Sequence, residues 1–255
     1  MQYLILLCFA FPAPVLQAAG VAQWITYPTP GIPRIADGKP NLTAPAPRTG
    51  GHVDLGGVWL KAPGIVGRLS AYMPVGSTIP VQPWADEAFK KRFPPSEIPS
   101  TKCLLHGVPD NMLVPEVFKI IQTPGVTVIL FEEFNHFRQI FTDGRPLPEP
   151  VQPAWLGYSV GKWEGDTFVV DTAGFNDKAP VDGEHLHTES LHTTERFRRI
   201  DFGHMEVSVT IDDPKAYDKP WTATVPFELQ ADTELIESIC ENEKDVVHLK
   251  GAEEK

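Results

Sequence analysis

The segment GEHLHTESLHTTERFRR, residues 183–199, concentrates the residue types that acid–base or metal chemistry uses. It holds three histidines, three glutamates and three arginines. A histidine exchanges protons near neutral pH, a glutamate can orient it, and an arginine can bind a substrate carboxylate or an oxyanion. We therefore predict a functional site here, with His187 as the proton-transfer group.

Alternation along this segment decides which side chains act together. In an extended chain, residues two apart share a side, which places His187 with Glu189, and with Glu195 if the strand continues without a bulge. We predict that Glu189 and Glu195 orient His187 or act as a second acid, and that Arg196 binds an anionic group of the substrate. The structural alternative is that Glu195 pairs with Arg196 or Arg198 on a solvated face.

The run VTVILFEEFNHFR, residues 126–138, supplies a second polar set. One face of an extended strand here is apolar at its start and carries Glu132, His136 and Arg138 at its end, as expected of a barrel interior with a polar mouth. The alternative, in which Glu132 and Arg138 face solvent at an edge, stays open. The predicted catalytic residues of this wall are Glu132 and His136, and the predicted substrate-binding residues are Arg138, Phe134 and Tyr158.

A metal site is the competing interpretation of the same residues. Imidazole and carboxylate ligands suit zinc, iron and manganese, and a catalytic site needs only three protein ligands. The sequence thus allows one divalent transition metal held by His187, His136 and Glu132. The spacing shows no second half of a metal motif, so metal-free acid–base catalysis remains open.

The elements that must position these residues are short strands. After Cys103, eight runs of strand-forming residues are separated by turn signals such as Thr123-Pro124-Gly125, and the last run is ELIESICE at residues 234–241. This pattern predicts a mostly β domain over residues 101–250. We expect an antiparallel meander that closes into a lipocalin-like barrel or a sandwich, because closure removes exposed strand edges.

The preceding residues 21–100 differ in composition. They are rich in proline and glycine, which predicts an extended arm around the domain. Within the arm, residues 83–93 begin with proline, carry acids in the first turn and bases in the last, which predicts one short helix.

The chain begins with an apolar segment. Residues 1–20 contain no Lys, Arg, Asp or Glu, and a short apolar run is followed by small residues, which is typical of a secretory signal peptide. An uncleaved membrane anchor is the alternative. We expect a periplasmic or secreted protein without stable membrane insertion after cleavage, and we predict that Cys103 and Cys240 form a disulfide there.

The formal net charge of −11 restricts the partners. A surface that on balance repels phosphate makes nucleic acid and anionic membranes poor candidates. We expect a small-molecule substrate or ligand.

Several stretches together resemble a widespread family of secreted bacterial proteins. They are RIADGKPNL, VDLGGVW, HFRQIFTDGRPLP, WLGYSVGKWEGDTFVVDTAGFND, HTESLHTTERFRR and IDDPKAYDKPWT. In the family pattern, His-[Ser/Thr]-Glu precedes Glu-Arg-Phe, which corresponds here to His187-Thr188-Glu189 and Glu195-Arg196-Phe197. The resemblance implies export and a mostly β domain, and it supplies no substrate.

These observations favour an exported enzyme that performs hydrolysis, elimination or isomerisation of a small organic molecule in a barrel pocket. The alternative is a lipocalin-like carrier of an apolar or amphipathic molecule. A third possibility is an envelope-interaction module that uses the proline-rich arm.

Overall fold

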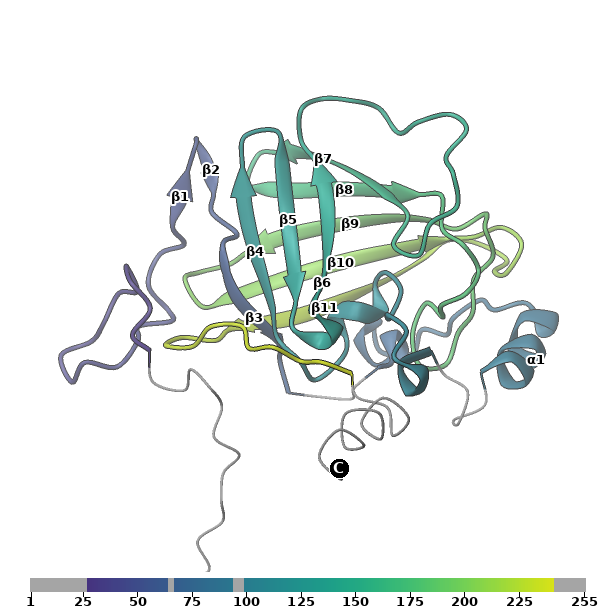
Figure 1. The fold of residues 1–255 in the computed structure, drawn as a ribbon, viewed down its shortest axis with the longest axis horizontal. Helices are drawn as coiled ribbons and strands as arrows, with labels where there is room; N and C mark the ends of the chain where they lie inside the picture. The colour runs from purple at the N-terminus through teal and green to yellow at the C-terminus, as the bar shows by residue number, and fades with distance from the viewer. Residues whose placement is uncertain (1–26, 64–66, 94–98, 241–255) are drawn as a thin grey trace, which may run out of the picture.

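A closed barrel of nine strands forms the body of the protein (Figure 1). The computed structural model describes residues 27–63, 67–93 and 99–240, so the predicted signal peptide lies outside the described residues. The barrel order is β10-β11-β3-β4-β5-β6-β7-β8-β9. Its strands are β3 (Gly57–Lys61), β4 (Phe118–Thr123), β5 (Val126–Phe131), β6 (His136–Phe141), β7 (Tyr158–Glu164), β8 (Thr167–Ala173), β9 (His192–Arg199), β10 (His204–Asp212) and β11 (Trp221–Leu229). The predicted mostly β barrel is confirmed.

Alternation of burial explains the strands. In β10, Met205, Val207, Val209 and Ile211 are buried, and the residues between them are half-buried. Figure 1 shows β4, β5 and β6 standing steeply in front of β8 to β11, so the barrel is flattened into two crossing layers. Aromatic side chains fill the space between these layers, and they include Trp59, Phe118, Phe168, Phe197 and Phe227.

The short helices lie outside the barrel wall. They are η1 (Leu69–Tyr72), α1 (Pro83–Arg92), η2 (Pro99–Lys102), η3 (Asp110–Met112) and η4 (Glu133–Asn135). Helix α1 matches the predicted helix at residues 83–93, with a proline at its start, Asp86 in its first turn and three bases in its last. These charges complement the helix dipole.

The predicted strand through residues 126–138 is interrupted. A turn from Glu132 to Asn135 separates β5 from β6, and Phe134 and Asn135 adopt left-handed backbone conformations, with φ of 53° and 49°. Alternation therefore restarts at His136, and Glu132 does not continue the face that carries Arg138. The buried face of β5 is that of Thr127, Ile129 and Phe131, opposite to the face proposed as the interior.

Two further strand predictions differ from the structure. The described part of the run at 234–241, up to residue 240, forms no strand; this segment is instead irregular and passes beside η4, where Glu132 accepts a hydrogen bond from the Ile236 N–H at 3.1 Å. The missing barrel strand comes from the proline-rich segment, because β3 pairs with both β11 and β4. The remaining arm carries a small hairpin of β1 (Arg48–Thr49) and β2 (His52–Val53).

The barrel is not purely antiparallel. Strands β6 and β7 are parallel and share only two residue pairs, Ile140 with Ser159 and Phe141 with Val160. The connection between them returns along the barrel before β7 begins, which makes the parallel direction possible. This short seam is the weakest backbone pairing of the barrel.

The predicted disulfide is present. Cys103 and Cys240 are bonded across 137 residues of sequence, with their Cα atoms 5.5 Å apart. The bond ties the end of the described chain to the segment that follows η2. Within the described residues, no helix is long and apolar enough to cross a membrane.

Candidate functional site

Several buried polar residues outside the strands, among them Asp182, His187 and Asp213, lie at one end of the barrel. Strand β8 ends there, β9 begins there, and α1 lies at the same end (Figure 1). Residues 174–191, which connect β8 to β9, pass across this end. They contain the HTE motif that the sequence singles out.

His187 is buried in this connection, with 3% of its surface exposed. Its Nδ1 lies 2.9 Å from the Thr188 carbonyl oxygen, and because a carbonyl only accepts, Nδ1 must carry the proton. Burial lowers the pKa of His187, against the opposing effects of the Thr188 hydrogen bond and of the Asp213 and Asp177 carboxylates. The ring is therefore neutral at pH 7, and its Nε2 carries a lone pair with no hydrogen bond among the described residues.

The IDDPKAY segment holds this loop in place. Asp213 accepts hydrogen bonds from the Thr188 N–H at 2.6 Å and from the Thr188 hydroxyl at 3.0 Å. The Tyr217 hydroxyl donates to the Leu186 carbonyl at 2.8 Å. Asp213 and Tyr217 are each 1% exposed, so two motifs that are distant in sequence jointly fix the ring of His187 from its flanking residues.

A pocket of about 440 Å³ opens beside His187. Its walls are one face of α1 and the connection between β8 and β9, and its lining residues are Trp84, Ala88, Lys91, Arg92, Asp177, Leu186, His187 and Thr188. This volume lies within the range of small-molecule sites, about 300 to 1,000 Å³. Arg92 donates to the Asp177 carboxylate at 2.7 Å and to the Asp177 carbonyl at 2.9 Å, which joins the two walls.

A second polar cluster lies at the same end, beneath β5 and β6. His106 contacts Asp110 through Nδ1 at 2.6 Å and Glu133 through Nε2 at 3.1 Å. Burial alone would lower the pKa of His106, but the hydrogen bonds and charges of these two carboxylates outweigh it and raise the pKa to about 10. His106 is therefore a cation held between two acids.

Several buried polar atoms near this cluster have no hydrogen-bond partner in the described part of the chain. They are Glu116 Oε2, Glu133 Oε2, His136 Nε2 and both amide atoms of Asn111. Burial raises the pKa of Glu116, and the nearby charge of Glu133 adds to the effect. None of these residues lines the pocket of His187, and we assign a structural role to the cluster.

The structure brings Arg138 and Glu195 together inside the barrel. Arg138 Nη1 donates to Glu195 Oε1 at 3.0 Å, Nη2 makes a further bond to Oε2, and the side chains are 1% and 0% exposed. Arg138 also donates to Ser159 at 3.1 Å and to Thr172 at 2.8 Å. One guanidinium therefore links β6 to β7, β8 and β9, across the weak parallel seam.

The other predicted site residues are dispersed. Glu189 is exposed on the turn before β9, and Arg196 is on the outer face of β9, 2.9 Å from Glu164. Phe134 is half-buried in the η4 turn. At the start of β7, the Tyr158 hydroxyl accepts a hydrogen bond from Arg145 at 3.2 Å. None of these side chains lines the pocket of His187.

The predicted metal ligands are also apart. His136 Nδ1 donates to the Glu133 carbonyl at 2.7 Å, burial lowers the pKa of this ring, and Glu132 is bound to the Ile236 N–H. Neither contacts His187. Among the described residues, no three His, Cys, Asp or Glu side chains are arranged to hold a metal ion.

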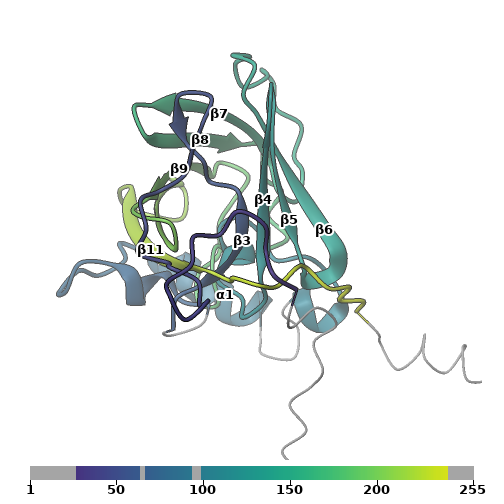
Figure 2. The ribbon, with the colours of Figure 1, turned by 90° about the vertical axis from the view of Figure 1, so that its left-hand side faces the viewer.

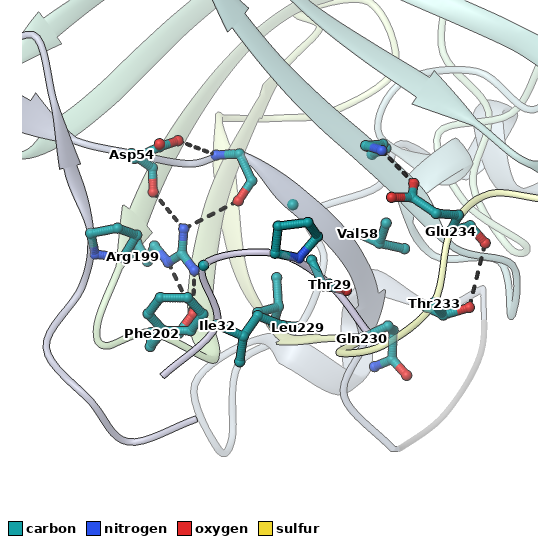
Figure 3. Close-up of a pocket in the computed structure, with 16 residues that line it drawn as sticks. Thr29, Ile32, Asp54, Val58, Arg199, Phe202, Leu229, Gln230, Thr233 and Glu234 are labelled. Atoms are coloured by element: carbon teal, nitrogen blue, oxygen red, sulfur yellow. Dashed lines mark hydrogen bonds and ion pairs between the residues drawn. The ribbon is translucent and has the colours of Figure 1, made fainter. Parts of the chain in front are cut away.

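Another pocket, of about 260 Å³, lies at the opposite end of the barrel (Figure 3). Figure 2 shows the arm and the C-terminal segment passing side by side there. Arg199 dominates its polar groups and donates to the carbonyls of Asp54 at 2.6 Å, Gly56 at 3.2 Å and Phe202 at 3.1 Å. Because its guanidinium is already bound to backbone, this pocket holds the arm against the barrel and offers less for chemistry than that of His187.

Comparisons with models of protein families, with curated proteins and with solved structures found no match. The resemblance to a family of secreted bacterial proteins therefore stays a prediction.

Sequence reasoning missed several residues at this end of the barrel. Trp84, Lys91 and Arg92 belong to helix α1, and the signal that groups them is their i, i+7 and i+8 spacing, which places them on one face of the helix. Asp177 carries no sequence signal that links it to α1. The signal for His106 is its i, i+4 spacing to Asp110, but Glu133 comes from a different segment that only the fold brings near.

Proposed function

We propose that the protein is an enzyme that uses His187 to transfer a proton to or from a small organic molecule bound between α1 and the connection from β8 to β9. The observation that carries this proposal is the state of the ring. Its Nδ1–H is fixed on a carbonyl, its Nε2 is unbound among the described residues, and it borders a pocket of ligand size.

A base of this kind must be neutral and held in place before the substrate arrives. Burial favours the neutral ring, and Asp213 holds Thr188, the residue whose carbonyl Nδ1 contacts, through its N–H and its hydroxyl. General acid–base catalysis by a positioned side chain contributes typically 10²–10⁴-fold. Hydrolysis, elimination and isomerisation all use such a step, and the pocket supports each of them.

Asp213 and Tyr217 act as positioning residues in this proposal. They hold the residues on either side of His187, since Asp213 binds the N–H and hydroxyl of Thr188 and Tyr217 binds the carbonyl of Leu186. Replacing Asp213 by Asn keeps the shape and removes one acceptor, so we expect kcat to fall with little change in KM.

The test is an activity panel followed by NMR. It combines p-nitrophenyl esters for hydrolysis, 3-hydroxycarboxylates for elimination and 2-oxo acids for proton exchange at carbon. We expect turnover in one class, reduced about 10²-fold or more in His187→Gln. The matched control is His192→Gln, because His192 is a half-buried histidine of the same segment outside this pocket.

Equal turnover by wild type and His187→Gln would overturn the proposal. The carrier alternative has less support, because the described void inside the barrel, between Leu55, Thr127 and Phe168, does not admit a water molecule. A ligand would therefore have to bind at an end of the barrel, not inside it.

We also propose that the protein is exported. A disulfide persists in oxidising compartments, and the apolar segment at residues 1–20 has the composition of a signal peptide. Intact-mass measurement of protein expressed with the full sequence tests this. Loss of about the first 20 residues supports export, and an uncleaved chain in the cytoplasm contradicts it.

A further inference from the structure

The pocket of His187 has two unlike ends, and both come from α1. Trp84, Ala88 and Lys91 are spaced four and three residues apart, so they follow one face of the helix. At a rise of 1.5 Å per residue, Trp84 and Lys91 are about 10 Å apart along the axis. The pocket is therefore flat and apolar near Trp84 and cationic near Lys91.

Lys91 has no ion-pair or hydrogen-bond partner among the described residues. Its neighbours do, since Lys90 lies 2.7 Å from Asp86 and Arg92 lies 2.7 Å from Asp177. Bases in the last turn of a helix also offset the helix dipole, but that role does not require a place in a pocket. An unpaired ammonium beside a pocket, in a chain of net charge −11, attracts an anion.

The indole ring of Trp84 is fixed by a hydrogen bond and remains partly exposed to solvent. Its indole N–H donates to the Lys215 carbonyl at 3.0 Å, and the residue remains 45% exposed. Ala88 and the buried Leu186 continue the apolar wall beside it. A fixed indole and aliphatic neighbours suit a flat apolar group, since stacked aromatic pairs contribute about 0.5 to 1.5 kcal/mol beyond burial.

We infer that the ligand of this pocket is a small organic anion with a flat apolar body, its anionic group at Lys91 and its body against Trp84. This inference rests on the proposed function, because it assigns a substrate class to the same site. In this pose the middle of the molecule faces the opposite wall, which includes His187. Arg92 is paired with Asp177, so Lys91 supplies the net positive charge of this pocket.

The test is direct binding of chosen probes by calorimetry on the full chain. They are 1-naphthoate, the neutral analogue 1-naphthalenemethanol, cyclohexanecarboxylate and 1-naphthyl phosphate. We expect 1-naphthoate to bind at least about tenfold more tightly than the neutral analogue, which lacks the charge, and than cyclohexanecarboxylate, which lacks the flat ring. A tenfold difference in Kd corresponds to about 1.4 kcal/mol of binding free energy. A preference for the phosphate over the carboxylate would assign the anion as a phosphate ester.

Variants locate the probe. Lys91→Ala and Trp84→Ala should each weaken 1-naphthoate binding about tenfold, the effect expected from loss of one charged contact or one stacked ring. Lys90→Ala is the matched control, because this lysine is next in sequence, is paired with Asp86 and does not line the pocket. Unchanged affinity in Lys91→Ala, or equal affinity for the neutral analogue, would overturn the inference.

The same measurements separate this inference from the proposed function. If 1-naphthoate binds as expected but no turnover depends on His187, the ligand class stands and catalysis fails. If turnover of a neutral substrate depends on His187 and the anions do not bind, catalysis stands and the ligand class fails.

Discussion

Arg138 on β6 and Glu195 on β9 form an ion pair inside the barrel, although 57 residues separate them in sequence. Ser159 and Thr172 occupy further donors of the same guanidinium. A buried pair of this kind adds little net stability against an apolar replacement, but the loss of one partner leaves an uncompensated charge. It joins β6 to β7, β8 and β9 at the seam where the barrel has its shortest backbone pairing.

We therefore expect Glu195→Gln to lower the free energy of unfolding by about 3 to 5 kcal/mol. The double variant Arg138→Met, Glu195→Leu should recover most of this loss, because it removes both charges. Urea unfolding measures both. The control is Glu164→Gln, which removes the exposed pair with Arg196 and should change stability by less than about 1 kcal/mol. A double variant no more stable than the single one would contradict the ion-pair explanation.

Stability should depend on pH through His106. Its pKa is raised to about 10 from an ordinary value of 6.5, so the folded protein holds this proton more tightly than the unfolded chain does. The contribution of this proton to the free energy of unfolding is complete below about pH 6.5 and is lost as pH rises through about 10. Unfolding free energies measured from pH 6 to 10 should fall with pH in the wild type.

The variant His106→Gln should flatten that pH dependence. At pH 7 it should also be less stable by about 3 to 5 kcal/mol, because Asp110 and Glu133 lose the cation between them. His204→Gln is the control, since His204 makes a similar 2.7 Å contact with Asp201 at the surface. An unchanged slope in His106→Gln would assign the pH dependence to other groups.

The disulfide should hold the C-terminal segment against the η4 turn. Ser238 N–H donates to Asn135 Oδ1, the Asn135 amide donates to the Ser238 carbonyl at 3.2 Å, and Ile236 N–H donates to Glu132. In Cys240→Ser we expect the Ser238 and Ile236 backbone amides to exchange with solvent faster while β10 amides keep their protection. The free energy of unfolding of the whole protein should fall by at most about 4 to 5 kcal/mol according to the chain-entropy model. Equal exchange rates of these amides in the wild type and in Cys240→Ser would show that the hydrogen bonds hold the segment without the disulfide.

The barrel could be predicted because alternation and turn residues are local properties. Runs such as MEVSVTI and TATVPFEL alternate strictly and became β10 and β11. The interruption at Glu132 could not be predicted, because the turn that follows places Glu133 against His106, which comes from another segment of the chain. Likewise GVWLK lies among proline and glycine, and only its pairing with β4 and β11 makes it a strand.

The candidate site was predictable in part. The HTE motif located His187, but alternation cannot extend from it to Glu195, since the Leu191 N–H donates to the Thr188 carbonyl at 3.1 Å and turns the chain between them. Arg138 and Glu195 were expected beside a cavity, and the fold pairs them with each other. The wall opposite His187 comes from α1, about 100 residues earlier in the chain, and no local pattern links the two.

The protonation of His187 should govern how activity and stability change at acidic pH. Because burial lowers its pKa below 6.5, the neutral form is favoured in the fold, and stability from this group falls as pH drops below about 6.5. If His187 acts as a base, kcat/KM should rise with pH to a plateau, with an inflection below 6.5. NMR titration of the imidazole nitrogens should give the same inflection and show the proton on Nδ1 above it.

Asp177→Asn should shift the inflection to lower pH, because the Asp177 carboxylate raises the pKa of His187, and Lys90→Ala should not move it. An inflection in kcat/KM that differs from the titration of His187 would assign the proton transfer to another group.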